Sequence, residues 1–507
     1  MKRWVCVASV LVMVFGLFQP IAFCEGGSAD TPAKESYRVA LPDELREIVN
    51  RNREIVFPQP HPGLMEIVKA YRTPDLDEEK DKGIAEILRQ SNAGDSEWLE
   101  FLTHDEILYE IDFLFDLMKY SYAAYEYFGG DEVFDAVKQL MLVKLSRMND
   151  PVRYDAYVDD LLAPCLRSVI IDNHFRIGYQ CIGIDNQLFM NETLIVHKDE
   201  NGFITTINER VYRVLRAGND FSFLFPTITR DGEFAYAFGW LTTSFGNRGR
   251  HGVGVVLEDL ETQERITQVV GVFPISNQYI ADLSRDTFTA TEIDGIAMIE
   301  NRRLTQYDDG GPSIEQFAQT GRAMRDEPVL ILDLRGNEGG NGMYAANWVK
   351  WYADLMRKEL TQPFAWMHLS SLTANEFFPY ASAASPPTWK VTPYSIPTAV
   401  IPNNHLLIVL IDNLVMSSGE GFVAYLRELE NVVFVGTSTK GCLVAGSVGS
   451  CQLPISRQPI SFGIGLNIRP DLSQFEGVGF MPDLWVPPGE SLERVVKFVE
   501  RYRVDDQ

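Results

Sequence analysis

The sequence predicts an α+β protein of three consecutive parts, and three changes in its residue pattern carry this expectation. From about residue 41 to 170, apolar residues recur at intervals of three and four, as on one face of a helix. From about residue 176 to 291 the runs are short and β-like, and turn residues separate them. In the last third, strand-like and helical runs alternate, which is typical of an α/β layered core. A chain of 507 residues is too long for one core, so several domains are expected.

The N-terminus has the features of an export signal. Lys2 and Arg3 precede an apolar run from Trp4 to Phe23, and small and polar residues follow it. We therefore expect residues 1–24 to be a signal peptide or an anchor, and the protein to be exported to the periplasm or the cell envelope. Three alternatives stay open, namely signal cleavage next to Cys24, lipid attachment at Cys24, and retention of the run as a membrane anchor.

Charge and cysteine content limit the possible partners. The formal net charge of −25 argues against a nucleic-acid partner, because nucleic acid needs clustered Lys and Arg. Cys442 and Cys451 flank the glycine-rich stretch "GCLVAGSVGSC", and in an exported protein we expect them to form a disulfide. Cys165 and Cys181 are a weaker candidate pair. No Cys/His spacing indicates zinc, and no cofactor is implied.

The first part, residues 25–175, begins with a polar linker and continues as a series of helices. Acidic residues stand near the start of the helical runs, as helix dipoles favour. The Gly129-Gly130 pair separates two of them. The helical runs are "LPDELREIVNRNREIV", "DEEKDKGIAEILRQ", "DEILYEIDFLFDLMKYSYAAYEYF", "DEVFDAVKQLMLVKLSRM" and "YDAYVDDLLAPCLRSVI".

The second part, residues 176–291, is expected to be mostly β. Asn201-Gly202 and Asp231-Gly232 are hairpin-turn pairs between its runs. Those runs include "FRIGYQCIGI", "LFMNETLIVHK", "FAYAFGWLTT", "GVGVVLE" and "ITQVVGVFPI".

The third part, residues 292–507, brings two serines to the start of a helix. The buried strand "HLLIVLID" leads to Ser417 and Ser418, and Glu420 follows. One interpretation is a helix N-cap with a capping box completed by Glu420. The other is a reactive hydroxyl at the positive end of the helix, with backbone amides free to bind an oxyanion. A second glycine-rich turn, "DLRGNEGGNG", also follows a buried strand and could supply a further amide.

Four motifs of this part resemble the C-terminal processing, or tail-specific, serine peptidases. They are "VLILDLRGNEGG", "LIVLIDNLVMSSGEGF", "VVFVGTSTKG" and "FEGVGFMPDLWV", in the family's order and spacing over about Asp294 to Val486. The resemblance implies a crotonase-like (ClpP/crotonase-type) α/β spiral catalytic core at 292–507, preceded by a helical cap and a β-rich insert. It also implies endopeptidase activity on protein or peptide substrates, and no metal or organic cofactor is implied. No oligomeric state is assigned.

The resemblance also assigns roles to individual residues. It makes Ser417 the nucleophile, because the family's serine lies three residues before the acidic residue, here Glu420. It makes the amides of Ser418 and Gly339 the oxyanion donors, with Gly340 as a possible substitute.

Two branches of the family differ in the base. The Ser/Lys branch places its lysine where this chain has Cys442, and Lys440 nearby is the alternative base. The tricorn-type branch uses Ser, His and Glu, and its positions match His174 in "DNHFRIG" and Glu476 in "FEGVGFMPD". The chain is therefore closer to the tricorn-type branch. In this scheme His174 is the base and Glu476 orients the site by hydrogen bonding.

The family commonly carries a peptide-binding PDZ domain between cap and core. The stretch "GFITTINERVYRVL" resembles a strand–helix passage of such a domain, so the insert is expected to be a degenerate PDZ-like module. The chain lacks the Gly-Leu-Gly-Phe loop whose backbone amides would capture a C-terminal carboxylate. An inactive peptide-binding surface protein of the same fold is the alternative to an enzyme.

Overall fold

A computed structural model describes most of the chain after residue 36. The described residues are 37–54, 59–93, 99–218, 221–242, 251–279, 288–306, 313–355, 360, 364–395 and 399–505. The expected signal or anchor at 1–24 lies outside them. Among the residues described, no helix is both long enough and apolar enough to cross a membrane.

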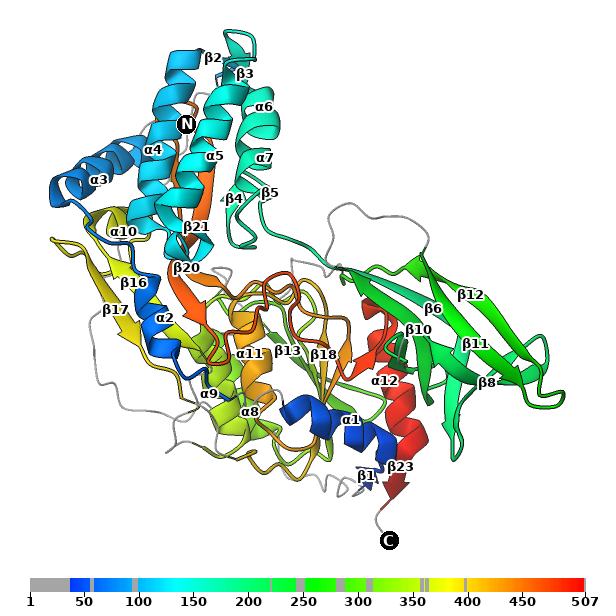
Figure 1. The fold of residues 1–507 in the computed structure, drawn as a ribbon. Helices are drawn as coiled ribbons and strands as arrows, with labels where there is room; N and C mark the ends of the chain where they lie inside the picture. Colours follow the sequence, from blue (N-terminus) through cyan, green and yellow to red (C-terminus); the bar gives the residue numbers. More distant parts are fainter. Residues whose placement is uncertain are drawn as a thin grey trace, which may run out of the picture.

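A six-stranded sheet forms the centre of the core, in the order β13-β14-β15-β18-β19-β22 (Figure 1). β13 pairs antiparallel with β14, and all later pairs are parallel. Every residue of β15, β18 and β19 is buried, which explains their unbroken apolar runs, because a parallel sheet is covered on both faces. The strands span Phe288–Ile293, Ile296–Asn301, Val329–Asp333, Leu406–Ile411, Val432–Gly436 and Leu484–Trp485.

Helices cover both faces of this sheet. On one face, α8 (Ile314–Ala323), α9 (Gly342–Tyr352) and α11 (Ser418–Leu426) share one apolar cluster with the strands. On the other face, α1 (Asp43–Glu54) and α12 (Pro488–Tyr502) share a second. β1 (Tyr37–Val39) pairs with β23 (Arg503–Asp505) beside them. Thus α1 packs on the core sheet, although the sequence places it in the helical cap.

The remaining N-terminal helices form a cap over a second sheet, seen at the top of Figure 1. They share one large apolar cluster with β16, β20 and β21. A full capping box starts α4, in which Thr103 and Glu106 bond each other's backbone amides. The cap elements are α2 (Leu64–Ala70), α3 (Glu78–Ala93), β2 (Phe101–Leu102), α4 (His104–Ser121), the 3-10 turn Glu126–Phe128, α5 (Gly130–Leu145), β3 (Val152–Arg153), α6 (Tyr154–Ala156), the π-helix Tyr157–Leu162 and α7 (Ala163–Leu166).

The second sheet joins the cap to the core. Its strand order is β17-β16-β21-β4-β5, and β20 also pairs with β21. The strands are β4 (Arg176–Ile177), β5 (Gln180–Cys181), β16 (Ala365–Ser370), β17 (Thr388–Thr392), β20 (Ala445–Gln452) and β21 (Pro459–Ile468), and α10 (Leu372–Phe377) follows β16. Since β4 begins two residues after His174, this pairing holds the "DNHFRIG" segment against the C-terminal part of the chain.

The insert is a seven-stranded antiparallel sheet that projects to the right of the core in Figure 1. β12 pairs with both β11 and β6, so five of the strands close on one another. The strands are β6 (Gln187–Asp199), β7 (Gly202–Ile207), β8 (Arg210–Ala217), β9 (Leu224–Ile228), β10 (Phe234–Thr242), β11 (His251–Asp259) and β12 (Arg265–Pro274).

The expectation of a strand–helix passage in this insert is wrong. "GFITTINERVYRVL" forms the hairpin β7–β8, whose strands pair from Ile207 opposite Arg210. Asn208 and Glu209 between them have φ of 49° and 66°. Two consecutive left-handed residues make the tight turn that returns a strand antiparallel, so the chain has no room to start a helix there. The passage that suggested a PDZ-like module is therefore absent.

The expected disulfide is also wrong. Cys165, Cys181, Cys442 and Cys451 are all free thiols. Cys442 lies before β20, while Cys451 lies near the end of this extended strand, opposite Ile460. An extended strand rises ~3.3 Å per residue, so Ala445 and Cys451 alone are about 20 Å apart. A disulfide needs Cα atoms within about 7 Å, so the two thiols cannot meet.

Alkylation tests this correction. We expect iodoacetamide to modify Cys442 and Cys451 completely in urea without any reductant, because neither thiol is oxidised. Peptide mass spectrometry measures the modification, and a sample reduced beforehand is the control. A non-reduced peptide that links Cys442 to Cys451 would contradict the structure.

Candidate active site

Ser417 lies at the turn between β18 and α11 in a strained backbone conformation. Its φ and ψ are 54° and −124°, a region that a residue with a side chain rarely adopts and that costs on the order of 1–3 kcal/mol. Its side chain makes no capping bond. The N-cap explanation of Ser417 therefore fails, and the strain needs another reason.

Glu420 does not complete a capping box either. Its Oε1 accepts hydrogen bonds from the Thr439 hydroxyl at 2.6 Å and the Gly441 amide at 2.8 Å. Its Oε2 accepts from the Cys442 amide at 2.7 Å. Burial raises the pKa of Glu420, although these donors oppose the shift. This carboxylate thus ties the first turn of α11 to the loop after β19.

The glycine-rich turn after β15 packs directly on Ser417. The Met416 amide donates to the Asn337 carbonyl at 3.0 Å. A Cβ on Gly339, whose φ is 90°, would lie 2.8 Å from the Met416 carbonyl oxygen and 2.9 Å from the Ser417 Cβ. Only glycine fits this approach. The two turns that the sequence singled out are therefore in contact.

Of the expected oxyanion donors, one amide is already hydrogen-bonded in the described part of the chain and two are not. The Gly339 amide donates to the Asn337 side chain at 2.9 Å, so it is occupied in this structure. The amides of Ser418 and Gly340 have no acceptor among the described residues. The Ser418 hydroxyl donates to the Gly340 carbonyl at 2.7 Å, which leaves the Ser417 hydroxyl as the uncommitted one of the pair.

A buried carboxylate supports the base of this turn. Asp412 follows β18, and its oxygens accept from the amides of Tyr279 at 2.6 Å, Gly336 at 2.9 Å and Leu414 at 3.1 Å. Burial raises the pKa of Asp412 to about 6, against the effect of these bonds. One side chain thereby connects the serine loop, the glycine-rich turn and the segment that returns from the insert.

A second buried carboxylate, Asp333, forms ion pairs with two arginines at the end of β15. Arg335 donates to it at 2.9 and 2.6 Å, and Arg302 at 2.7 Å. Burial alone would raise the pKa of Asp333, but the two guanidinium groups hold it well below its usual range. The Tyr279 ring lies 4.0 Å from the Arg335 guanidinium carbon. The sequence motif "DLR" is therefore an ion-pair anchor for the turn.

Three asparagines pin both connections of the insert to the serine loop. Asn413 donates to the Asn186 side chain at 2.9 Å, and Asn277 donates to the Asn186 carbonyl at 2.9 Å. The Asn413 amide donates to the Asn277 carbonyl at 2.9 Å. Residues before β6 and after β12 thus share one buried polar cluster with the residue that follows Asp412.

The segment that carries His174 meets the loop that Glu420 binds. The Asn173 side chain donates to the Gly441 carbonyl at 2.8 Å, and the Gly441 amide donates to Glu420, three residues after Ser417, at 2.8 Å. The His174 Nδ1 lies 3.6 Å from the Asp172 carboxylate. Neither ring nitrogen has a hydrogen-bond partner among the described residues, and both are buried. The structure therefore brings His174 toward the serine without forming a Ser417–His174 hydrogen bond.

Glu476 acts on the backbone around His174 and not on its ring. It accepts from the amides of Asn173 at 2.6 Å, Val444 at 2.9 Å and Leu443 at 3.0 Å. Burial and the nearby charge of Asp172 raise its pKa well above the usual range. Glu476 thus joins the segment that carries His174 to the loop before β20.

The alternative base, Lys440, is engaged elsewhere. Its ammonium donates to Asp185 at 2.8 Å, and its amide donates to the Val415 carbonyl at 2.9 Å. Cys442, which stands at the position of the family's lysine, is buried. Among the described residues, no group of three His, Cys, Asp or Glu side chains is arranged to hold a metal.

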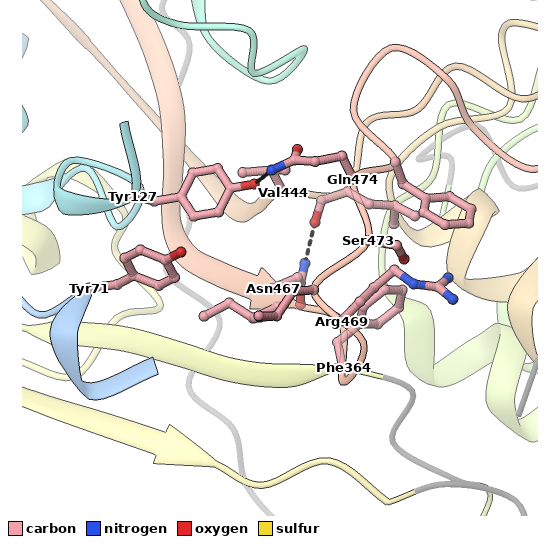
Figure 2. Close-up of a pocket in the computed structure, with 12 residues that line it drawn as sticks. Tyr71, Tyr127, Phe364, Val444, Asn467, Arg469, Ser473 and Gln474 are labelled. Atoms are coloured by element: carbon pink, nitrogen blue, oxygen red, sulfur yellow. Dashed lines mark hydrogen bonds between the residues drawn. The ribbon is translucent and has the colours of Figure 1, made fainter. Parts of the chain in front are cut away.

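A small cavity of about 60 Å³ lies between the cap and the core, next to Leu443 and Val444. Figure 2 shows Tyr71 and Tyr127 facing Asn467, Ser473 and Gln474 across it. Gln474 donates to the Tyr127 hydroxyl, and Asn467 donates to the Leu443 carbonyl at 2.8 Å. The cavity therefore shares its walls with the loops that Glu476 joins.

Residues 302–486 match the model of peptidase family S41. The matched segment lies within the third part of the chain. It contains Ser417 and the loops around it, and the protein is accordingly a serine-type peptidase, a hydrolase of peptide bonds. No curated protein matches the chain.

Several solved structures are similar to the chain. A crystal structure of mature CPAF shares 14% identity over 79% of this chain and 96% of that one, with a TM-score of 0.40. A putative peptidase from Parabacteroides merdae ATCC 43184 shares 14% over 76% and 90%, with a TM-score of 0.36. The photosystem II D1 C-terminal processing protease shares 12% over 79% and 98%, with a TM-score of 0.33.

Sequence reasoning missed several residues that support the turn around Ser417. Asp412 could have been found, because a carboxylate directly after a buried parallel strand stands at the edge where ligands and loops meet. Asn337 lies within a quoted motif, but the motif does not show that its side chain takes the Gly339 amide. The Asn186–Asn277–Asn413 cluster has no signal in the sequence, because its members are far apart along the chain.

A substitution at Gly339 tests the contact between the two turns. We expect Gly339→Ala to lower kcat/KM at least about 10²-fold, as the loss of an oxyanion donor does, because the new Cβ would push Ser417 out of place. Peptide hydrolysis measures the rate. Gly421→Ala on α11 is the matched control, since its Cβ meets nothing within 4 Å. A fully active Gly339→Ala enzyme would show that catalysis does not need the close approach of the glycine-rich turn to Ser417.

Asp412 predicts a pH dependence of stability. Its native pKa of about 6 exceeds the unfolded value of ~3.9, so the folded state binds the proton more tightly. The stability due to this proton is full below pH ~4 and is lost as pH rises through 6, on the order of 3 kcal/mol in all. Urea unfolding from pH 4 to 7 should show this loss in the wild type and in Asp326→Asn, a change at an exposed site. The Asp412→Asn variant should not lose this stability. If the free energy of unfolding changed with pH in the same way in all three proteins, the assignment of this pH dependence to Asp412 would be refuted.

Proposed function

We propose that the protein is an exported serine endopeptidase that cleaves protein or peptide substrates through an acyl-enzyme. The observation that carries this proposal is the strained Ser417, whose hydroxyl is uncommitted, at the positive end of α11 and against the Gly339–Gly340 turn. Strained residues persist where the surroundings over-determine them, and they cluster at active sites. A serine at a strand-to-helix turn presents its hydroxyl at the surface of such a site.

In the proposed mechanism Ser417 Oγ attacks the carbonyl carbon of the scissile bond, and His174 accepts the serine proton. The oxyanion forms at the N-terminus of α11, where the Ser418 and Gly340 amides are free to donate to it. Collapse of the tetrahedral intermediate breaks the C–N bond, and His174 protonates the leaving amine. Water then hydrolyses the Ser417 ester by the reverse proton transfers.

The absence of a Ser417–His174 bond is compatible with this mechanism. Catalytic hydrogen bonds are often long before substrate binds and shorten in the Michaelis complex. Both ring nitrogens of His174 are buried and unbonded, so a bound substrate that draws Ser417 and His174 together would also satisfy a nitrogen now without a partner. Glu476 keeps His174 in reach by holding the neighbouring Asn173 amide.

The same proposal includes a crotonase-like core and the tricorn-type Ser/His/Glu assignment. The Lys440 ammonium is bonded to Asp185 at 2.8 Å, which disfavours Lys440 as the base, because a base must reach the serine hydroxyl and this group is engaged by another residue. The features of residues 1–24 support export to the periplasm or cell envelope. We propose cleavage within extended segments, because the sequence lacks the Gly-Leu-Gly-Phe motif whose backbone amides would capture a C-terminal carboxylate.

The proposed roles can be tested with one panel of variants. Ser417→Ala and His174→Ala should each lower kcat by several orders of magnitude, because they remove the nucleophile and its base. Lys440→Ala should stay within about threefold of the wild type, as expected for a partly exposed ion pair. Cleavage of an unstructured protein, followed by mass spectrometry, measures all four proteins.

Other outcomes of this panel have defined meanings. Loss of cleavage in Lys440→Ala with full activity in His174→Ala would move the enzyme to the Ser/Lys branch. No cleavage by the wild type across pH and substrates would favour the inactive peptide-binding protein.

A further inference from the structure

We propose that Asp172 is the carboxylate that positions His174, and that Tyr122 of the cap fixes Asp172 for this role. The inference rests on the proposed function, in which His174 is the general base. Asp172 Oδ1 lies 3.6 Å from His174 Nδ1. Of the carboxylates in the described residues, it alone comes within 4.0 Å of a ring nitrogen of His174.

The other two carboxylates near His174 are committed to backbone amides. Glu476 accepts from Asn173 with Oε1 and from Leu443 and Val444 with Oε2. Glu420 likewise uses both oxygens, on donors of the loop after β19. Moving either carboxylate toward the imidazole would leave buried amides unpaired, which is costly. The role of orienting the base therefore falls to Asp172.

The geometry of Asp172 allows this role with little movement. Its Oδ1 already accepts the His174 amide at 2.8 Å, and a carboxylate oxygen has two lone pairs. A rotation of the imidazole that shortens the 3.6 Å separation by about 0.7 Å would form an Nδ1–H bond of normal length. That bond would place the proton on Nδ1 and leave the Nε2 lone pair free to accept the Ser417 proton.

Tyr122 holds the other oxygen of Asp172 from the cap side. Its hydroxyl donates to Asp172 Oδ2 at 2.9 Å, and its ring packs against Phe175 and Phe462 at 5.4 and 5.1 Å. Burial, followed by the charge of Asp172, raises the pKa of Tyr122 well above its usual range, so this phenol stays a donor. Tyr122 directly follows α4. The orientation of the base is thereby tied to the position of the cap.

Asp172 also has a purely structural role that the experiment must separate from positioning. Its Oδ1 caps the local turn through the His174 amide, as aspartate often does. Asp172→Asn keeps an oxygen for this cap and removes the charge that orients the imidazole. Tyr122→Phe removes one hydroxyl from the network. Tyr125→Phe is the matched control, because its hydroxyl bonds Asp131 elsewhere in the cap at 3.0 Å.

The test measures kcat and KM for peptide hydrolysis by the full chain. We expect Asp172→Asn to lower kcat roughly 10²–10⁴-fold with KM within about threefold, since a wrong imidazole tautomer blocks the chemical step and not binding. Tyr122→Phe should lower kcat about 3–10-fold, the effect of one lost hydrogen bond, and Tyr125→Phe should leave it unchanged. Asp172→Asn with kcat within threefold of the wild type would overturn the proposal.

A second measurement keeps the proposal testable if Asp172→Asn does not fold. The ¹⁵N resonances of His174 in the wild type, assigned against His174→Gln, report which ring nitrogen carries the proton. Protonation at Nδ1 is expected, and a neutral ring protonated at Nε2 would refute the positioning role. Full activity of His174→Ala would instead refute the proposed function itself, so the two failures are distinguishable.

Discussion

The site depends on one buried carboxylate, that of Glu476. It binds the amide next to His174 and two amides of the loop before β20, so three backbone donors from two distant segments converge on two oxygens. Charge-assisted bonds of this kind are short and strong. Together with the β4–β21 pairing and the bond from the Asn173 side chain to the Gly441 carbonyl, they hold the segment that carries His174 against the core. Burying the Glu476 carboxylate costs free energy, and the three hydrogen bonds that converge on it offset this cost.

The strain at Ser417 depends on a second set of contacts in the same region. Asn337, Gly339 and Asp412 hold the backbone on either side of the serine. A backbone in a sparsely populated region persists only when its neighbours over-determine it. Here the neighbours come from the ends of two parallel strands, β15 and β18, which pair in register. The sheet therefore positions Ser417 through the backbone on either side of it.

Much of the architecture could be predicted from local pattern. The unbroken apolar runs of β15 and β18 identified buried parallel strands, and period-two runs identified the β-rich insert. The errors have local causes. Two left-handed residues turned an expected strand–helix passage into a hairpin, and an extended strand separated two cysteines that are near in sequence. Packing of Leu45 and Val49 placed α1 on the core sheet. The apolar pattern of an amphipathic helix shows that one face is buried but not which surface covers it.

The sequence by itself determined the order of the three parts and the two glycine and serine turns, and it singled out the candidate site residues. These are properties of short stretches, where periodicity, turn residues and motifs are directly readable. Tertiary structure alone decided that Glu476 bonds the backbone beside His174, that Asp172 faces the imidazole, and that the Gly339 amide is occupied. Those facts depend on which buried donors and acceptors pair in the folded chain. The Glu476 bond joins residues 303 positions apart, for which the sequence carries no local signal. The other two contacts join residues two positions apart, and the surrounding packing sets the direction of their side chains.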